Sequence, residues 1–122
     1  MRIRVRRFIE AELGNPKLSP ALIAARLGLS RSTLYRVFAP NGIVSYIRDR
    51  RLMHAMRMLV RDEAQPARVS RVAFAVGFSD ERTFRRAFKR RFGFIPSDAA
   101  QRPGPGRGPE PLSVLQSWIE SL

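Results

Sequence analysis

Two short segments of the chain place cationic and polar side chains at helical spacing, where they could bind a nucleic acid. The candidates share the outward face of a predicted helix, and they are Arg31, Ser32, Tyr35, Arg36, Glu81, Arg82, Arg85, Arg86 and Lys89, with Arg90 beyond them. Arginine can donate two hydrogen bonds to O6 and N7 of guanine, and glutamate can accept one from N4 of cytosine. Any single arginine could instead bind a phosphate or remain a solvated charge. As a set, these side chains predict contact with duplex DNA.

The net charge of the chain is concentrated in the part that contains these residues. The 122 residues include 23 Lys and Arg against 10 Asp and Glu, which gives a formal net charge of +13. Residues 102–122 contain two Arg and two Glu, so the whole excess lies in residues 1–101. Such an excess favours a polyanionic partner, either DNA, RNA or an anionic membrane surface. The alternative is a basic surface without a specific partner.

The residue types present argue against an enzyme. The chain has no cysteine and one histidine, which excludes disulfides, thiolate metal sites and a cysteine nucleophile. The carboxylates form no cluster with the spacing of metal ligands. Neither a Ser/His/Asp set nor a glycine-rich phosphate loop is found. We therefore expect no catalytic residue, no metal and no cofactor.

Hydropathy predicts a folded protein that does not span a membrane. Hydrophobic residues make up 44% of the chain, enough for a packed core. No apolar run approaches the ~18 residues of a membrane-spanning helix, and no signal peptide is recognisable. We expect a soluble cytoplasmic protein that does not bind a membrane.

Apolar residues recur at helical spacing between glycines and prolines, and no segment alternates as a strand would, which predicts an all-α fold. The predicted helices cover about 5–13, 20–27, 31–39, 44–61 and 69–76, then 79 or 80 to 92, and a short turn from 96. Ser19 is the expected N-cap of the second helix, with Pro20 at its first position, and Ser30 is the expected N-cap of the third. Residues 62–68, which include Pro66, are expected to form a loop.

An internal repeat is the most informative feature of the sequence. The segment IAARLGLS at 23–30 aligns with VAFAVGFS at 72–79. After the turn the pair Thr-Leu at 33–34 aligns with Thr-Phe at 83–84, so the second copy has one extra residue in its turn. Each copy has an alanine inside its first helix, where a small side chain permits a close crossing, and a glycine that accepts the backbone angles of a tight turn. These are the requirements of a helix-turn-helix, whose second helix enters the DNA major groove.

The sequence therefore predicts two helix-turn-helix units, at about 18–39 and 69–92, joined by one long linking helix. About 18 residues at ~1.5 Å rise give a linking helix of roughly 27 Å. Together with the offsets of the two second helices, this length brings their separation near one DNA turn of ~34 Å. One chain could then bind two successive major grooves, with DNA bending if the linking helix is rigid.

The C-terminal part is predicted to be separate from this domain of residues 1–101. Seven of the ten residues at 102–111 are Pro or Gly, which predicts a linker without regular structure. Residues 112–122 then place Leu115, Trp118, Ile119 and Leu122 on one face of a short amphipathic helix. That face either packs back on the domain or contacts a partner.

The two repeated units and the linking helix resemble the DNA-binding domain of the AraC/XylS family of bacterial transcription regulators over roughly residues 4–98. The motifs that carry the resemblance are Leu18-Ser19-Pro20, Leu27-Gly28-Leu29-Ser30, Arg51-Leu52, Met58-Leu59, Val72-Ala73, Gly77-Phe78-Ser79, Phe88-Lys89, Phe92-Gly93 and Pro96. The chain departs from the family pattern at Ile95, where Ser or Thr is usual, and at Ala99-Ala100, where Tyr-Arg is frequent. The last small helix is therefore expected to be short or altered.

The resemblance implies a seven-helix domain that binds promoters sequence-specifically and usually activates transcription through contacts with RNA polymerase. Many members also carry an effector-binding or dimerisation domain, commonly N-terminal, which this sequence does not include. We therefore expect either a small stand-alone regulator or a fragment or truncated product of a larger one. The family's DNA-repair methyl acceptors need a cysteine, and this chain has none.

Two other functions stay open on the sequence alone. One is a helical interaction module that acts through a protein partner without contacting DNA. The other is sequence-independent binding of nucleic acid, driven by charge. Substitution of Arg82, Arg85 and Arg86 would separate the first from DNA recognition, and a binding-site selection would separate the second.

Overall fold

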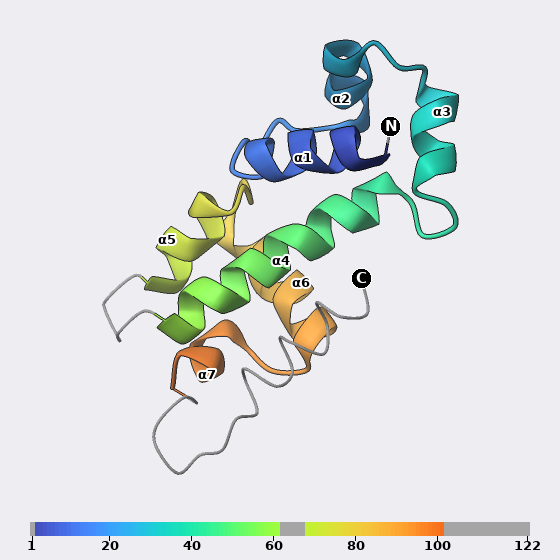
Figure 1. Ribbon diagram of the computed structural model, residues 1–122. Coiled ribbons are helices and arrows are strands. Elements are labelled where there is room, and N and C mark those ends of the chain that lie inside the picture. The colour runs from blue at the N-terminus through green and yellow to red at the C-terminus, as the bar shows by residue number, and fades with distance from the viewer. Residues whose placement is uncertain (1, 62–67, 102–122) are drawn as a thin grey trace.

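The computed structural model describes residues 2–61 and 68–101, and in these ranges all regular secondary structure is α-helical (Figure 1). The helices are α1 (Arg2–Glu12), α2 (Pro20–Leu27), α3 (Arg31–Val37), α4 (Ile43–Arg61), α5 (Arg68–Ala75), α6 (Glu81–Phe92) and α7 (Pro96–Gln101). The prediction of an all-α fold with seven helices is confirmed. The predicted linker at 102–111 and the helix at 112–122 lie outside the described residues.

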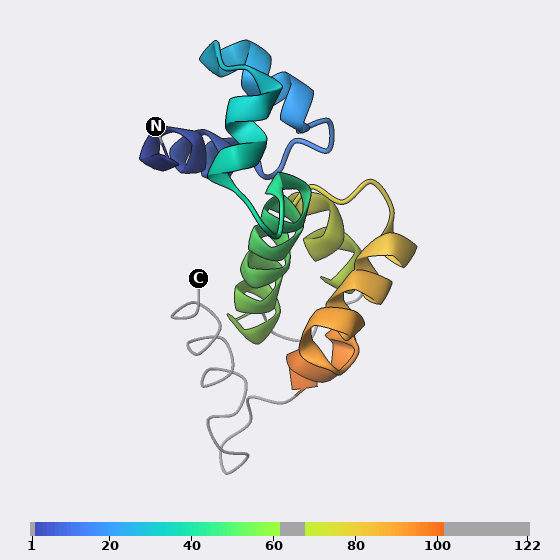
Figure 2. The ribbon, with the colours of Figure 1, turned by 90° about the vertical axis from the view of Figure 1, so that its right-hand side faces the viewer.

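Two hydrophobic cores divide the helices into two units that share α4. The first core joins α1, α2 and α3 to the beginning of α4 and includes Val5, Ile23, Leu34 and Ile47. The second joins the rest of α4 to α5, α6 and α7. Figure 2 shows α3 near the N-terminal end of α4 and α6 beside its other half. The linking helix therefore belongs to both units, and its two ends carry them.

Helix α4 is continuous over 19 residues, a length of about 28 Å, as its predicted role requires. Its side chains Ile43 and Ile47 enter the first core, whereas Met53 and Met56 are fully buried in the second. A continuous helix that is packed at both ends acts as a rigid spacer between the two units.

The observed helix boundaries correct the sequence-based ones in two places. Helix α3 ends at Val37, two residues earlier than predicted, and Phe38 follows it as the C-cap with its ring in the first core. Arg68 is the first residue of α5 and is buried, although it was expected in the loop at 62–68. Helix α7 forms despite the departures from the family pattern, and its Ala99 is fully buried in the second core.

Within the described residues, no helix is long and apolar enough to cross a membrane.

Candidate nucleic-acid interface

The first helix-turn-helix consists of α2 and α3, and three residues define its helix ends and its turn. Ser19 Oγ accepts a hydrogen bond from the backbone N–H of Leu22 at 3.1 Å and caps α2. Gly28 ends α2 in the left-handed conformation, with φ of 67°. Ser30 Oγ accepts from the N–H of Thr33 at 3.1 Å and opens α3. The caps predicted at Ser19 and Ser30 are confirmed, and they fix where α2 and α3 begin.

The second helix-turn-helix repeats this arrangement in α5 and α6. Gly77 occupies the turn with φ of 103°, and Phe78 packs behind it into the second core. Asp80 is the N-cap of α6, because its Oδ1 accepts from the N–H of Thr83 at 2.7 Å. Asp80 therefore takes the place of Ser30, and Ser79 is the extra residue of the turn. The hydrogen bonds to the Thr83 N–H and hydroxyl hold the pKa of the Asp80 carboxyl below its usual value.

The second helices bury the predicted side chains and expose the candidate contact residues. Leu34 of α3, together with Phe84 and Phe88 of α6, is fully buried. The exposed candidates are Arg31, Ser32, Tyr35 and Arg36 on α3, and Arg82, Arg85, Arg86, Lys89 and Arg90 on α6, whereas Glu81 is half-buried. The structure thus presents two separate outward faces, one on each unit, as the repeat predicted.

Glu81 and Arg85 form an ion pair with each other on the side of α6. The Nε–H of Arg85 donates to Oε2 of Glu81 at 2.5 Å, one helical turn apart. The Glu81 carboxylate is therefore engaged within the helix, which changes the expectation that it accepts from cytosine on its own. Because the Nε of Arg85 is used, its terminal Nη1 and Nη2 groups are the end available for a base or phosphate.

A hydrogen-bonded junction fixes the first unit against the turn of the second. Arg51 of α4 donates from Nε to the carbonyl of Leu13 at 3.0 Å and from Nη2 to the carbonyl of Asn15 at 2.7 Å. A Cβ atom placed on Gly77 would lie 2.1 Å from the Leu13 carbonyl oxygen and 2.7 Å from Arg51 Nε. Only a glycine therefore permits this approach of the second turn to the end of α1.

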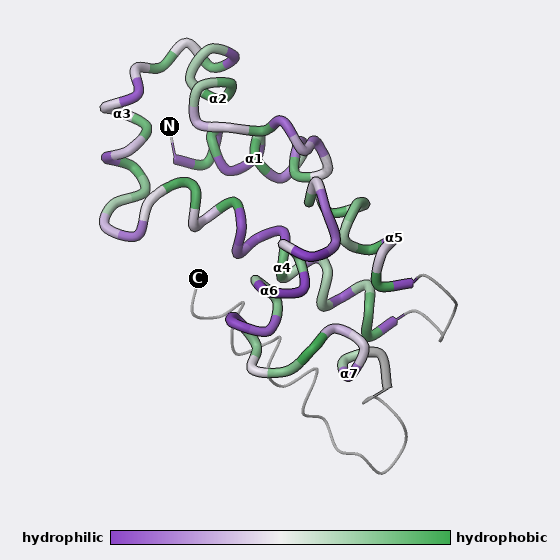
Figure 3. Tube along the Cα trace, turned by 180° about the vertical axis from the view of Figure 1, so that it is seen from behind, coloured by the Kyte–Doolittle hydropathy of each residue, from purple (hydrophilic) through white to green (hydrophobic). Residues whose placement is uncertain are grey.

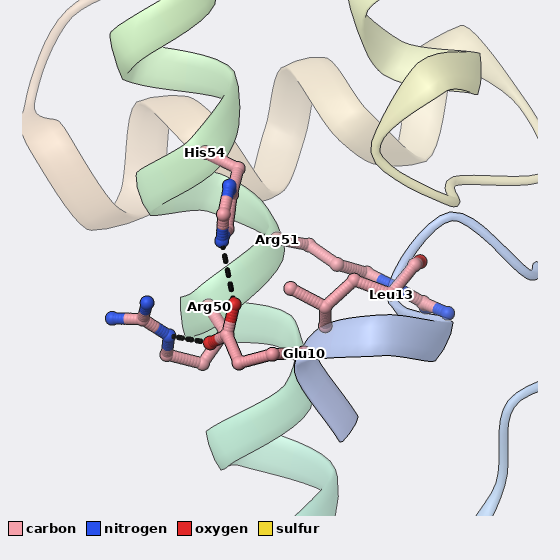
Figure 4. A network of polar contacts seen from close by, with 5 residues as sticks. All are labelled: Glu10, Leu13, Arg50, Arg51 and His54. Atoms are coloured by element: carbon pink, nitrogen blue, oxygen red, sulfur yellow. Dashed lines mark hydrogen bonds and ion pairs between the residues drawn. The ribbon is translucent and has the colours of Figure 1, made fainter. Parts of the chain in front are cut away.

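A second polar contact, drawn in Figure 4 beside the Arg51 and Leu13 side chains, ties α1 to α4. The Glu10 carboxylate accepts from Arg50 Nε at 2.5 Å and lies 2.8 Å from His54 Nε2. Burial raises the pKa of the Glu10 carboxyl, but the hydrogen bonds and charges of Arg50 and His54 outweigh this and lower it. The lone histidine is thus a structural partner of Glu10. Together with the Arg51 junction, this contact holds α1 on α4 and so helps to fix the orientation of the two outward faces.

Arg48 is a further exposed arginine beside the candidate contact residues of α6, and the sequence pattern does not single it out. It is exposed on α4, outside both helix-turn-helix units, and lines a groove of about 480 Å³ together with Arg86 and Arg90 of α6. The signal available in the sequence was only one more arginine in a predicted helix, because the face of α4 that meets α6 depends on tertiary packing.

No group of three or more potential metal ligands occurs among the residues that the structure describes.

Comparison with known proteins gives a consistent picture. A family model described as a helix-turn-helix domain matches residues 23–102. The crystal structure of a probable AraC family transcriptional regulator from Rhodopseudomonas palustris is 30% identical, with a TM-score of 0.67, over 83% of this chain and 94% of that one. The structure of the DNA-binding domain of AdpA in complex with a target DNA has a TM-score of 0.72 at 23% identity, covering 82% of this chain and 89% of that one, and shares the fold.

A longer relative also matches. The Msm operon regulatory protein of Streptococcus mutans is 35% identical over 97 residues, which are 77% of this chain and 34% of the relative. This chain therefore spans about a third of that protein's length.

Proposed function

This chain belongs to the AraC family of helix-turn-helix DNA-binding transcription regulators, and we propose that it binds a bipartite promoter site with α3 and α6 in two successive major grooves. The observation that supports this proposal is the pair of exposed basic faces on two capped helices, held at the ends of one rigid helix. A recognition helix that is amino-terminally capped and packed on its apolar side presents its outer side chains to base edges.

Some of the exposed residues contact bases, and the others contact phosphates. Arg36 and Arg86 take equivalent places in the two units, on the side opposite the buried leucine and phenylalanine of each helix. We assign to these arginines, and to Arg82 and Arg85, hydrogen bonds to guanine O6 and N7. Tyr35, whose side chain is 49% exposed, contacts a thymine methyl or a phosphate. The remaining candidates, Arg31, Ser32, Lys89 and Arg90, are assigned to the edges of the two grooves, and Glu81 acts through Arg85.

The wider role follows the family. The domain of residues 1–101 acts in the cytoplasm as an activator that contacts RNA polymerase, without catalytic activity or cofactor. Binding energy comes largely from phosphate contacts, so affinity falls steeply with salt.

The proposal is tested by selection of duplexes from a random pool at ~0.15 M salt, followed by affinity measurements on the selected site. We expect two short motifs whose centres are about one helical turn, 10–10.5 base pairs, apart. Arg86→Ala should relax the base preference of one motif and Arg36→Ala that of the other. A matched control is Arg7→Ala, an exposed arginine of α1 that lies outside both recognition helices. Recovery of DNA without any motif would refute sequence-specific recognition and leave charge-driven binding.

A further inference from the structure

The groove between α4 and α6 concentrates positive charge at the edge of the α6 recognition face. Its charged lining consists of Arg48, Asp49, Arg86, Arg90 and Arg91. Arg48 and Asp49 come from the linking helix, and the other three come from α6. Figure 3 shows a hydrophilic stretch in the middle of α4 and hydrophilic turns in α6, the two helices that supply this lining.

The single carboxylate of the groove is already engaged. Asp49 Oδ1 lies 3.4 Å from Arg91 Nε, which leaves three arginines whose charge no acidic lining residue compensates. Arg48 is placed only by a long contact of 3.4 Å from its Nη2 to Ser45 Oγ. Burial and the nearby Arg48 charge lower the pKa of Arg91, against the opposing effect of Asp49. Like charges so close to one another repel, and an anion bound among them would remove that repulsion.

The position of Arg48 relates this charge to both units. Arg48 and Thr83 also line a second groove, which extends to Ser19 and Pro20 at the beginning of α2. Arg48 therefore lies where the linking helix passes between the start of α2 and the start of α6. Arg86 is shared between the charged groove and the outward face of α6. An anion in the charged groove would thus lie beside α6, on the side of that helix that faces the first unit.

We propose that this groove binds one phosphate of the DNA backbone between the two half-sites, and that Arg48 of the linking helix is its principal ligand. This inference rests on the proposed function, because it requires duplex DNA to lie across both units. Arg90 supplies a second guanidinium from α6. A planar guanidinium can give a phosphate two parallel hydrogen bonds, which fixes register without selecting a base.

The first experiment compares Arg48→Ala with Arg61→Ala, an exposed arginine at the other end of α4 that gives the same change of charge. We expect Arg48→Ala to weaken binding of all duplexes by the same factor. The negative slope of the logarithm of the binding constant against the logarithm of the salt concentration should become shallower by about 0.9, the value for one phosphate contact. Base preference in both half-sites should be unchanged. Arg48→Lys should retain most of the slope, and Arg61→Ala should behave as the unaltered protein. An unchanged slope in Arg48→Ala would overturn the proposal.

The second experiment locates the phosphate. Single uncharged methylphosphonates are placed in turn along the backbone between the half-sites, and each duplex is measured with the unaltered protein and with Arg48→Ala. We expect one position at which the modification weakens the unaltered protein but has no further effect on Arg48→Ala. Penalties that add at every position would overturn the proposal while leaving bipartite recognition intact. Failure of the unaltered protein to select any bipartite site would instead refute the proposed function, and with it this inference.

Discussion

The recognition helix of the first unit has seven residues and two arginines, whereas that of the second has twelve residues and six Arg or Lys. The backbone plan is nevertheless the same in both units: a left-handed glycine, an N-cap and a threonine three residues later. The caps differ only in chemistry, a serine in one unit and an aspartate in the other. The two units therefore share the geometry of their turn and cap and differ in the charge of their outward faces.

The two turns also differ in what surrounds them. A Cβ atom on Gly28 would meet nothing within 4 Å, whereas one on Gly77 would meet the Leu13 carbonyl and Arg51. The first turn therefore faces solvent, and the second is packed against the other unit. From this asymmetry we expect the second turn to set the relative orientation of the units.

The largest expected effect is that of Gly77→Ala compared with Gly28→Ala. Both changes place a side chain in the left-handed region, which costs about 1–2 kcal/mol. Gly77→Ala must in addition displace backbone that would lie 2.1 Å from the new Cβ, and we expect a total cost of about 4 kcal/mol or more. Denaturant unfolding of the two variants measures the difference. Equal losses of stability would show that the second turn is as free as the first.

Arg51→Met should affect spacing more than affinity for a single half-site. The change removes the hydrogen bonds to Leu13 and Asn15 and keeps most of the apolar stem. We expect a loss of about 2 kcal/mol in folding stability, below the full value of two charged hydrogen bonds because Arg51 is partly exposed. Adding or removing one base pair between the half-sites should reduce the affinity of the variant less than it reduces the affinity of the unaltered protein. A spacing preference identical to that of the unaltered protein would contradict the role of the junction.

A smaller effect is expected for Glu81→Ala, which tests a feature found only in the second unit. Without the carboxylate, the Arg85 side chain loses its orienting partner on α6. We expect base discrimination at one position of the second half-site to fall by about 1 kcal/mol, the lower end for a bidentate base contact. The first half-site, bound by α3, serves as the internal control. Sharper discrimination in the variant would mean that Glu81 competes with DNA for Arg85.

The smallest effect concerns acid stability and follows from the caps. The folded pKa of Asp80 is lowered below its ordinary value of 3.8, so its contribution is present above that value and is lost as pH falls through the folded pKa. Asp80→Ser would give the second unit the cap of the first, which does not titrate. We expect the stability of the unaltered protein to fall more steeply below about pH 3.8 than that of Asp80→Ser, since Glu10 titrates in both. If the stability of the two proteins falls in parallel with pH, titration of Asp80 does not contribute to acid stability.

The repeated local features of the fold could be predicted from the sequence, because each depends on a few neighbouring residues. Ser19, Ser30 and the glycines of both turns mark helix ends by their own chemistry, and the buried faces follow from helical spacing. The contacts between the units could not be predicted in this way. The approach of Gly77 to Leu13, the hydrogen bonds of Arg51 and the groove beside Arg48 join residues that are far apart in the sequence. They depend on how the two cores pack on α4, which no local pattern encodes.

We infer that the two recognition helices bind one duplex at a spacing fixed by the fold. This spacing is tested most directly by measuring affinity for the selected site before and after insertion of five base pairs, about half a helical turn, between the half-sites. We expect this insertion to lower the affinity to that of a duplex carrying one half-site, because the second groove then faces away from the protein. Insertion of a full turn should not restore it, since α4 cannot lengthen. Affinity unchanged by the half-turn insertion would show instead that the two faces bind DNA independently.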